Sequence, residues 1–217
     1  ELGEGPHVKM SLATSPSAIP VTQDLTLARG AGTATAKVAL DTDCTSTAAC
    51  TQYFRARFVP EPGRAATWRV ICRHLAPWIP RDARVLDLGA GYCSFANALD
   101  AAEKHALDAH PGFAEYAAPG VQTHVGRCDD LSRFPDRHFD VVFASNLLEH
   151  LAGAELERTL REALRVLRPG GRLLLVQPNF RYCVREYFDD YTHRTIFTHV
   201  SLADCLLGKK CELKDTC

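Results

Sequence analysis

The segment Val85-Leu86-Asp87-Leu88-Gly89-Ala90-Gly91 is the most informative stretch of this 217-residue sequence. Its apolar residues predict a short buried strand, and helical spacing begins again near Phe95. Since glycine has no Cβ, Gly89 and Gly91 permit a tight turn and let a ligand approach the backbone at the end of the strand. The same G-x-G spacing also occurs in plain strand-to-helix turns, so this segment alone leaves both interpretations open.

Strands and helices alternate on both sides of this segment. Apolar runs predict strands that end at Asp108 and that cover 121–125, 139–144 and 172–176, and helical spacing covers 68–79 and 156–167. Strand–helix–strand units are joined by right-handed crossovers, and they build a parallel sheet with helices on both faces. The sequence therefore predicts an α/β domain.

The beginning of the chain has a different composition. Residues 1–50 contain no Phe, Tyr or Trp and are rich in Ala, Thr, Ser and Gly. Such a segment has few large apolar groups with which to offset the entropy of ordering. We therefore expect residues 1–52 to form a flexible, low-complexity N-terminal extension and residues 53–217 to form the folded domain.

Composition and charge limit the partners of the chain. The formal net charge is −1 at pH 7, which is too small to hold a polyanion against salt, so we expect no nucleic acid partner. No run of about 18 apolar residues and no signal peptide are visible, so we expect no membrane span and a cytoplasmic location. One helix region mixes basic and acidic residues, which is typical of a solvated face and requires no binding role: Arg158, Arg161, Arg165 and Arg168 with Glu155, Glu157 and Glu162.

The cysteines do not follow a metal-binding pattern. The chain has nine of them, and no two have the C-x-x-C spacing that is common in zinc sites. Disulfide frameworks are typical of small secreted domains. We therefore expect reduced thiols and no metal site.

A second acid supports the ligand-binding interpretation of the glycine turn. Asp108 lies 19 residues after Gly89, at the end of the next predicted strand, where a carboxylate can accept hydrogen bonds from the ribose hydroxyls of an adenosine ligand. A dinucleotide fingerprint would place a third glycine at position 94, which is Ser94. An NAD-linked oxidoreductase is therefore an alternative that this residue disfavours.

Four segments together resemble one enzyme family. Val85–Gly91 resembles motif I of the class I S-adenosylmethionine-dependent methyltransferases, and Phe134–Val142, Asn146–Leu151 and Leu164–Gly171 resemble later family segments in the same order. Tyr182–Leu207 resembles, more loosely, the substrate side of small bacterial members. The resemblance implies a Rossmann-like, mostly parallel sheet with helices on both faces. It also implies methyl transfer from S-adenosyl-L-methionine to a small or medium acceptor, with S-adenosylhomocysteine as product.

The resemblance implies a cofactor site at the carboxyl edge of the sheet, formed by Asp87, Gly89, Gly91, Asp108, Cys128, Asp129 and Asn146. Asp87 would face the amino group of the cofactor's methionine, and Asp108 would accept hydrogen bonds from the ribose. The adenine would lie near Cys128 and Asp129. Asn146 would border the methionine or methyl end.

The chain departs from the family pattern at two cofactor positions. Cys93 stands where the family often has a third glycine, and Arg127 stands where an Asp often follows the glycine after the third strand. These departures leave the adenine contacts open. They also keep open the alternative of a non-catalytic or impaired S-adenosylmethionine-binding domain.

The end of the chain differs from the family as well. The family sheet usually has seven strands, the last of them antiparallel and inserted between the fifth and the sixth. After a predicted helix over 201–207, only Cys211–Lys214 remains to form a sixth strand, so the C-terminal strand seven is expected to be missing. Either the chain is a fragment, or another segment or a partner covers strand 172–176. An uncovered edge would invite self-association.

Two histidines are the candidate catalytic bases. His150 follows the strand 139–144 by a few residues, and His193 lies in the aromatic-rich segment 180–200, which is expected to act on the substrate side or as a lid. Both histidines could instead serve the structure, and segment 180–200 could instead pack its rings internally. Tyr191 and Glu149 are weaker candidates.

Overall fold

The structure, a computed structural model, describes residues 7–11, 61–208 and 212–216. Its centre is a seven-stranded sheet with the order β4-β3-β2-β5-β6-β1-β7, in which neighbouring strands of the described residues run parallel. The strands are β1 (His7–Ser11), β2 (Arg84–Leu88), β3 (Glu103–Asp108), β4 (Val121–Val125), β5 (Phe139–Ser145), β6 (Leu167–Val176) and β7 (Glu212–Thr216).

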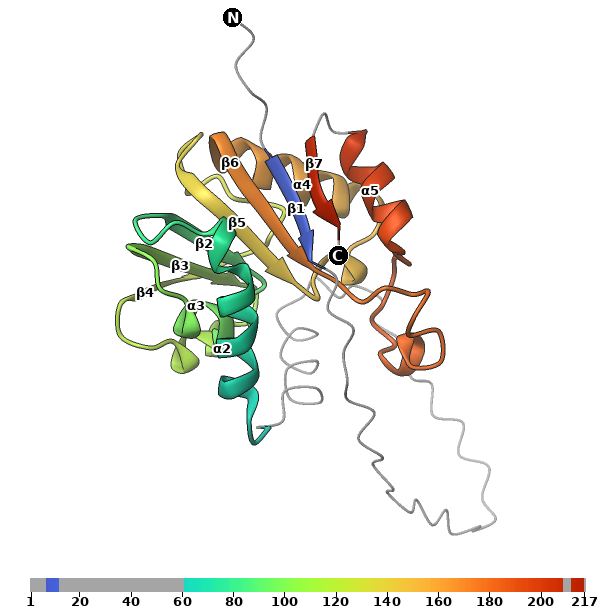
Figure 1. The fold of residues 1–217 in the computed structure, drawn as a ribbon, viewed down its shortest axis with the longest axis horizontal. Coiled ribbons are helices and arrows are strands. Elements are labelled where there is room, and N and C mark those ends of the chain that lie inside the picture. Colours follow the sequence, from blue (N-terminus) through green and yellow to red (C-terminus); the bar gives the residue numbers. More distant parts are fainter. Residues whose placement is uncertain (1–6, 12–60, 209–211, 217) are drawn as a thin grey trace, which may run out of the picture.

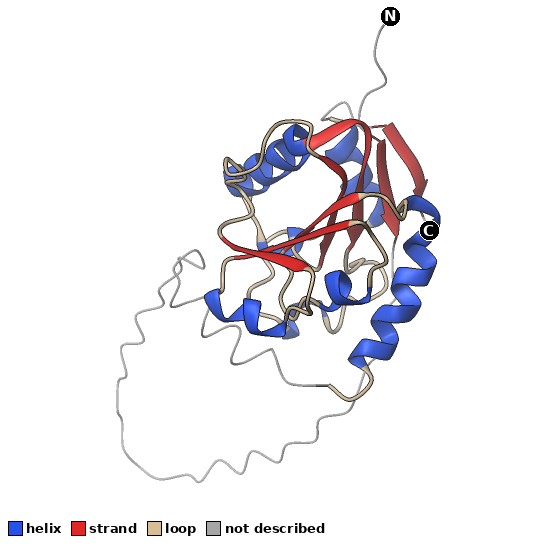
Figure 2. Ribbon diagram, turned by 90° about the vertical axis from the view of Figure 1, so that its left-hand side faces the viewer, coloured by secondary structure: helices blue, strands red, loops and turns tan. Residues whose placement is uncertain are grey.

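Helices cover both faces of this sheet (Figures 1 and 2). The α-helices are α2 (Arg64–Leu75), α3 (Ser94–Ala98), α4 (Gly153–Val166) and α5 (His199–Leu207). Short 3₁₀ turns are η1 (Ala76–Trp78), η2 (Pro111–Tyr116), η3 (Leu148–His150) and η4 (Tyr187–Asp189). This arrangement confirms the predicted α/β fold.

Side chains along the central strands alternate between two apolar layers, as the pleat of a strand requires. One layer packs against α4 and α5 and includes Leu86, Leu88, Val142, Leu173, Leu160 and Leu202. The other layer packs against α2 and α3 and includes Val85, Val141, Phe143, Leu174, Leu75 and Phe95. Because both faces are covered, the central strands are nearly continuous apolar runs.

The neighbour of β6 comes from the beginning of the chain. β1 pairs with β6 from His7 opposite Arg172 to Ser11 opposite Val176, and its other side pairs with β7. The sequence left open whether another segment or a partner covers the strand 172–176, which is part of β6. In the structure a segment of the same chain, β1, lies beside β6 and runs parallel to it. The rest of the predicted N-terminal extension, residues 1–6 and 12–52, lies outside the described residues.

Candidate functional site

The glycine turn after β2 is held by hydrogen bonds to β3. The amides of Gly89 and Ala90 donate to the carbonyl oxygen of Leu107 at 2.8 and 3.1 Å. Gly89 and Gly91 have φ angles of 68° and 51°, which residues with a Cβ rarely adopt. A Cβ on Gly89 would lie 3.0 Å from Leu147 Cδ1. The turn therefore needs glycine, and it brings the end of β2 against the residues that follow β5.

Asp108, the last residue of β3, is anchored to this turn. Its Oδ2 accepts a hydrogen bond from the amide of Gly91 at 2.9 Å, and its Oδ1 accepts one from the amide of His110 at 2.8 Å. Burial raises the pKa of the Asp108 carboxyl, while these amide hydrogen bonds oppose the shift. Each carboxylate oxygen has a further lone pair, so Asp108 can also accept hydrogen bonds from the hydroxyl groups of a ligand.

Asp87 is a buried acid with an unsatisfied oxygen. Only 3% of its surface is exposed, and no group among the described residues bonds to its Oδ2. Burial raises the pKa of Asp87 to about 8, the nearby Asp108 charge adds to the shift, and a hydrogen bond from the Ala96 amide opposes it. A buried acceptor without a partner costs about 1–3 kcal/mol. Asp87 therefore suits a ligand that brings a donor or a positive charge.

Asn146 joins the ends of β5 and β6. It follows β5 with a left-handed φ of 47°, and its amide donates to the carbonyl oxygen of Val176 at 2.9 Å. Asp87, Asp108 and Asn146 thus lie at the carboxyl ends of the neighbouring strands β2, β3 and β5. The chain reverses its direction of sheet growth between β2 and β5, and ligands of open α/β sheets bind at such a point.

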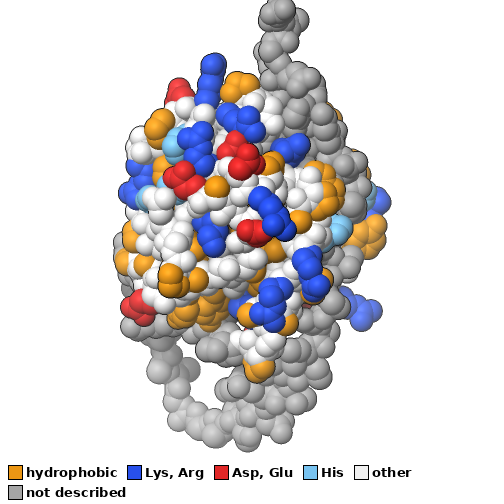
Figure 3. Space-filling model, turned by 60° about the vertical axis from the view of Figure 1, so that its left-hand side comes forward, with side chains coloured by type: hydrophobic (Ala, Val, Ile, Leu, Met, Phe, Trp, Pro, Cys, Tyr) orange, Lys and Arg blue, Asp and Glu red, His pale blue; other side chains and the backbone are white. Residues whose placement is uncertain are grey.

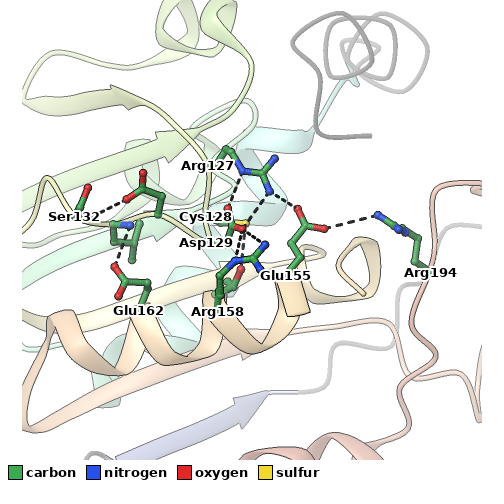
Figure 4. Close-up of polar contacts among 11 residues, drawn as sticks. Arg127, Cys128, Asp129, Ser132, Glu155, Arg158, Glu162 and Arg194 are labelled. Atoms are coloured by element: carbon green, nitrogen blue, oxygen red, sulfur yellow. Dashed lines mark hydrogen bonds and ion pairs between the residues drawn. The ribbon is translucent and has the colours of Figure 1, made fainter. Parts of the chain in front are cut away.

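The carboxylate of Asp129 is bound by two arginines (Figure 4). Arg127 Nε donates to Oδ1 and Arg158 Nη2 donates to Oδ2, both at 2.8 Å. Burial alone would raise the pKa of Asp129, but the hydrogen bonds from both guanidinium groups outweigh it and lower the pKa. Next to it, the sulfur of Cys128 accepts a hydrogen bond from Thr159 Oγ1 at 3.5 Å. The predicted adenine side therefore has its carboxylate turned toward α4.

The predicted solvated face on α4 is found only in part, since Arg158 and Arg161 are exposed but Arg165 is half-buried. Arg158 bonds to Asp129 as described, and Arg165 Nη2 donates to the carbonyl oxygen of Leu131 at 2.8 Å and to Glu162 Oε2 at 2.7 Å. The helix spacing could not show this, because Asp129 and Leu131 come from the loop before β5. These arginines fasten α4 to that loop.

His150 and His193 lie together at the carboxyl edge of the sheet, with ring centroids 5.0 Å apart. Glu149 directly precedes His150 in η3 and is 1% exposed. Glu149 Oε2 accepts a hydrogen bond from Gln177 Nε2 at 2.6 Å. Burial raises the pKa of Glu149 to about 7, and the charge of Asp190 adds to the shift. The sequence ranks Glu149 below both histidines, and only its position directly before His150 draws attention to it.

The aromatic segment 180–200 lies over η3. The amides of Arg194 and Thr195 donate to the carbonyl oxygen of Glu149 at 2.7 and 3.0 Å. Tyr187 is buried, and its hydroxyl donates to the carbonyl oxygen of Thr195 at 2.6 Å. Phe197 is buried as well, whereas several large apolar side chains of the segment are exposed: Tyr182, Val184, Phe188, Tyr191, Ile196 and Val200. The segment therefore has a packed centre and an exposed apolar surface.

A cavity of about 550 Å³ lies beside the glycine turn, between α2 and α3. Its lining residues are Glu61, Arg64, Ala65, Arg69, Tyr92, Ser94, Asn97, Ala98 and Tyr116. None of the predicted site residues lines it. Figure 3 shows one face of the molecule, on which basic, acidic and apolar side chains are interspersed. No helix of the described residues is long and apolar enough to cross a membrane.

Comparison with known proteins gives sequence relatives. Residues 86–175 match a family described as a methyltransferase domain. Malonyl-[acyl-carrier protein] O-methyltransferase of Methylococcus capsulatus is 37% identical over 46% of this chain and 38% of that protein. Phosphoethanolamine N-methyltransferase of Plasmodium falciparum is 22% identical over 57% of this chain and 50% of that protein. The chain thus spans about half the length of these curated relatives, or less.

Solved structures show the same fold. A SAM-dependent methyltransferase from Archaeoglobus fulgidus has a TM-score of 0.59 at 19% identity, over 66% of this chain and 67% of that one. A SAM-dependent methyltransferase from Thermotoga maritima has a TM-score of 0.58 at 20% identity, over 76% and 78%. Residues 86–175 of this chain are therefore similar to a methyltransferase domain, and the chain has the fold of the class I S-adenosylmethionine-dependent methyltransferases.

Proposed function

We propose that this domain transfers the methyl group of S-adenosylmethionine to a small or medium acceptor. The observation that carries the proposal is the buried Asp87, whose Oδ2 has no partner among the described residues, beside a glycine turn that holds Asp108. An ammonium group is the kind of ligand that satisfies Asp87, and a pair of hydroxyl groups suits Asp108. An amino acid joined to a nucleoside carries both.

When bound, S-adenosylmethionine supplies a methyl group that is already activated by its sulfonium. The residues of this chain then have to bind and orient the cofactor and the acceptor and to exclude water. Good orientation alone can lower the reaction barrier by roughly 7–11 kcal/mol. Gly89 and Gly91 let the ligand approach the backbone, while Asn146 borders it at the end of β5. Cys128 and the backbone beside Asp129 remain the adenine side of the proposal, since the Asp129 carboxylate is already bound by arginines.

The acceptor belongs on the side of His150 and His193 in this proposal. An unprotonated imidazole nitrogen of either histidine can take a proton from an acceptor or coordinate a cation. Either role requires the two histidines to lie beside the acceptor. The exposed apolar side chains of segment 180–200 would contact its body. The names of the two curated relatives refer to an oxygen and a nitrogen as methylated atoms, so the acceptor atom of this chain stays open.

Calorimetric titration of the chain with S-adenosylhomocysteine tests the proposal, with NAD in parallel. We expect micromolar binding of S-adenosylhomocysteine and none of NAD. The variant Asp108→Ala should bind S-adenosylhomocysteine more than about tenfold more weakly, because the ribose hydroxyls lose a charged acceptor worth roughly 1.5–3 kcal/mol. Asp82→Ala, at an exposed acid before β2, is the matched control.

The outcomes separate the candidate functions. Unchanged affinity in folded Asp108→Ala would refute the ribose assignment. Binding of NAD alone would favour the oxidoreductase alternative. A folded chain that binds neither ligand would contradict the proposed function.

A further inference from the structure

The side chains of Glu149, His150 and His193 form a cluster of atoms that could bind a metal ion, and the cluster contains no cysteine. One ligand atom from each residue lies within 4.8 Å of the others. Glu149 and His150 belong to η3, just after β5, whereas His193 comes from the segment between β6 and α5. We call these three residues the Glu149 cluster. It lies at the carboxyl edge of the sheet, where Asn146 also lies.

The carboxylate of Glu149 is only half satisfied. Its Oε2 accepts the hydrogen bond from Gln177, but its buried Oε1 has no hydrogen-bond partner among the described residues. A buried carboxylate oxygen without a partner is unfavourable unless a proton or a cation meets it. The two histidines beside it offer nitrogen ligands, so the cluster has the donor set that a cation needs.

Hydrogen bonds set the tautomer of both histidines. His193 Nδ1 donates to the carbonyl oxygen of Tyr187 at 2.5 Å, because a carbonyl can only accept. His150 Nδ1 lies 2.8 Å from Thr192 Oγ1, whose own hydrogen is donated to Asp190 Oδ1 at 2.5 Å, so this nitrogen also donates. In the neutral form of each ring, Nε2 therefore carries the lone pair. Metal-binding histidines are commonly oriented in this way, by a carbonyl or a carboxylate on the other nitrogen.

The surroundings favour a positive ion. Asp190 adds a negative charge near Glu149. The positive charge of the nearby Arg194 is paired with Glu155, whose Oε2 lies 3.7 Å from Arg194 Nη1 (Figure 4). The backbone amides of Arg194 and Thr195 bond to the Glu149 carbonyl, which fixes segment 180–200 over η3.

A second group of similar composition does not have these properties. In the set Glu103, His105 and His138, both nitrogens of His105 already contact other side chains, Glu103 Oε1 at 2.7 Å and His124 Nε2 at 3.0 Å. His138 Nδ1 lies 3.2 Å from the guanidinium of Arg84, which would repel a cation. This set serves as an internal control for the Glu149 cluster.

We propose that Glu149, His150 and His193 bind a divalent transition-metal ion such as Zn²⁺ or Co²⁺. Two imidazoles and one carboxylate are a known ligand set for such ions, and three protein ligands leave a coordination position for water or for an oxygen of the acceptor. The use of that position by the acceptor rests on the proposed function. Metal binding itself does not rest on the proposed function. This proposal replaces the expectation, drawn from the sequence, that the chain has no metal site.

Metal titration of the chelator-treated full chain tests this site. Calorimetry with Zn²⁺ and Co²⁺, together with the Co²⁺ absorption spectrum, should show one bound ion with nitrogen and oxygen ligands and no thiolate band. His150→Ala and His193→Ala should each weaken binding about 100-fold or more, since even outer-shell partners contribute roughly 10–100-fold. His138→Ala, in the control set, should bind the ion as the unmodified chain does. No binding, or equal binding by all three variants, would overturn the proposal.

Two further measurements guard against misfolding and against confusion with the proposed function. Thr192→Val removes only the hydroxyl that orients His150, and it should weaken Co²⁺ binding about tenfold in a chain with unchanged circular dichroism. His193→Ala should still bind S-adenosylhomocysteine, and Asp108→Ala should still bind Co²⁺. Metal binding without S-adenosylhomocysteine binding would refute the proposed function alone, and the reverse result would refute the metal site alone.

Discussion

Asp87 and Asp108 show how much the environment of a single residue matters in this domain. Both are acids at the ends of neighbouring strands, but Asp87 is buried whereas Asp108 is half-buried. Asp108 has backbone amides on both of its oxygens, whereas Asp87 has a bare buried oxygen. The two acids therefore differ in their hydrogen bonding, and a bound cation would stabilise the unpaired carboxylate oxygen of Asp87.

The raised pKa of Asp87 predicts a pH dependence of stability. Its value of about 8 in the folded chain lies far above its ordinary value of 3.8, so the folded ligand-free state binds a proton that the unfolded state releases. The stability that this group contributes is complete below about pH 4 and is lost as the pH rises through about 8. Between about pH 5 and 8.5, thermal unfolding of the ligand-free chain should therefore show falling stability.

The variant Asp87→Asn isolates this contribution. It cannot ionise, so its stability should fall less steeply over the same pH range, while Asp108 and Glu149 titrate in both chains. The difference between the two unfolding curves is the measurement. Parallel curves would contradict the assignment of a protonated Asp87. Asp82→Asn, at an exposed acid, should follow the unmodified chain.

Helix α4 illustrates what an element contributes beyond its apolar face. Its stripe packs as predicted, with Leu160 and Ala163 buried against the sheet. Its opposite side also makes tertiary contacts, since Arg158 and Arg165 donate hydrogen bonds to the loop that leads into β5. The same helix thus covers the core and holds the loop on the predicted adenine side.

Removal of the Arg165 side chain should destabilise the domain. Its guanidinium bonds to the carbonyl oxygens of Leu131 and Phe134 and to the carboxylates of Asp136 and Glu162. Arg165→Ala removes all of these hydrogen bonds, and we expect a loss of about 1–3 kcal/mol in the free energy of unfolding. Urea denaturation measures it. Arg161→Ala, at an exposed position of the same helix, should change stability by less than about 0.5 kcal/mol.

The whole molecule depends on a strand from the beginning of the chain. β1 lies between β6 and β7, where the related fold usually has an antiparallel strand from the end of the chain. With β1 in place, β6 has partners on both sides and exposes no edge. The sheet therefore joins residues that are far apart in the sequence.

Disruption of β1 should weaken the fold and expose strand edges. Val8 pairs with Leu173 on one side and Leu213 on the other, and proline at position 8 removes a backbone donor from the interior of the sheet. Val8→Pro should lower the free energy of unfolding by about 1–3 kcal/mol. It should also increase self-association, because open edges pair with other chains. Thermal unfolding and sedimentation velocity measure these effects, with Val8→Thr as control. Unchanged stability and association in Val8→Pro would contradict the pairing.

Much of the fold was predictable from local pattern. The strands ending at Asp108 and covering 121–125 and 139–144, and the helix around Leu160, appear where spacing places them. Periodicity and turn residues act between near neighbours, so they can be read along the chain. The glycine turn and its two acids follow from the same information, because the carboxyl ends of parallel strands share one edge.

Contacts between distant segments required the tertiary structure. The arginines on Asp129, the joining of Glu149 with His193, and the insertion of β1 beside β6 each bring together residues that no local spacing relates. Sheet pairing through backbone groups depends little on side-chain identity, so the composition of the first residues could not place β1. The burial of Glu149 also required the tertiary structure, because its Oε1 is without a hydrogen-bond partner only when packing excludes water from it.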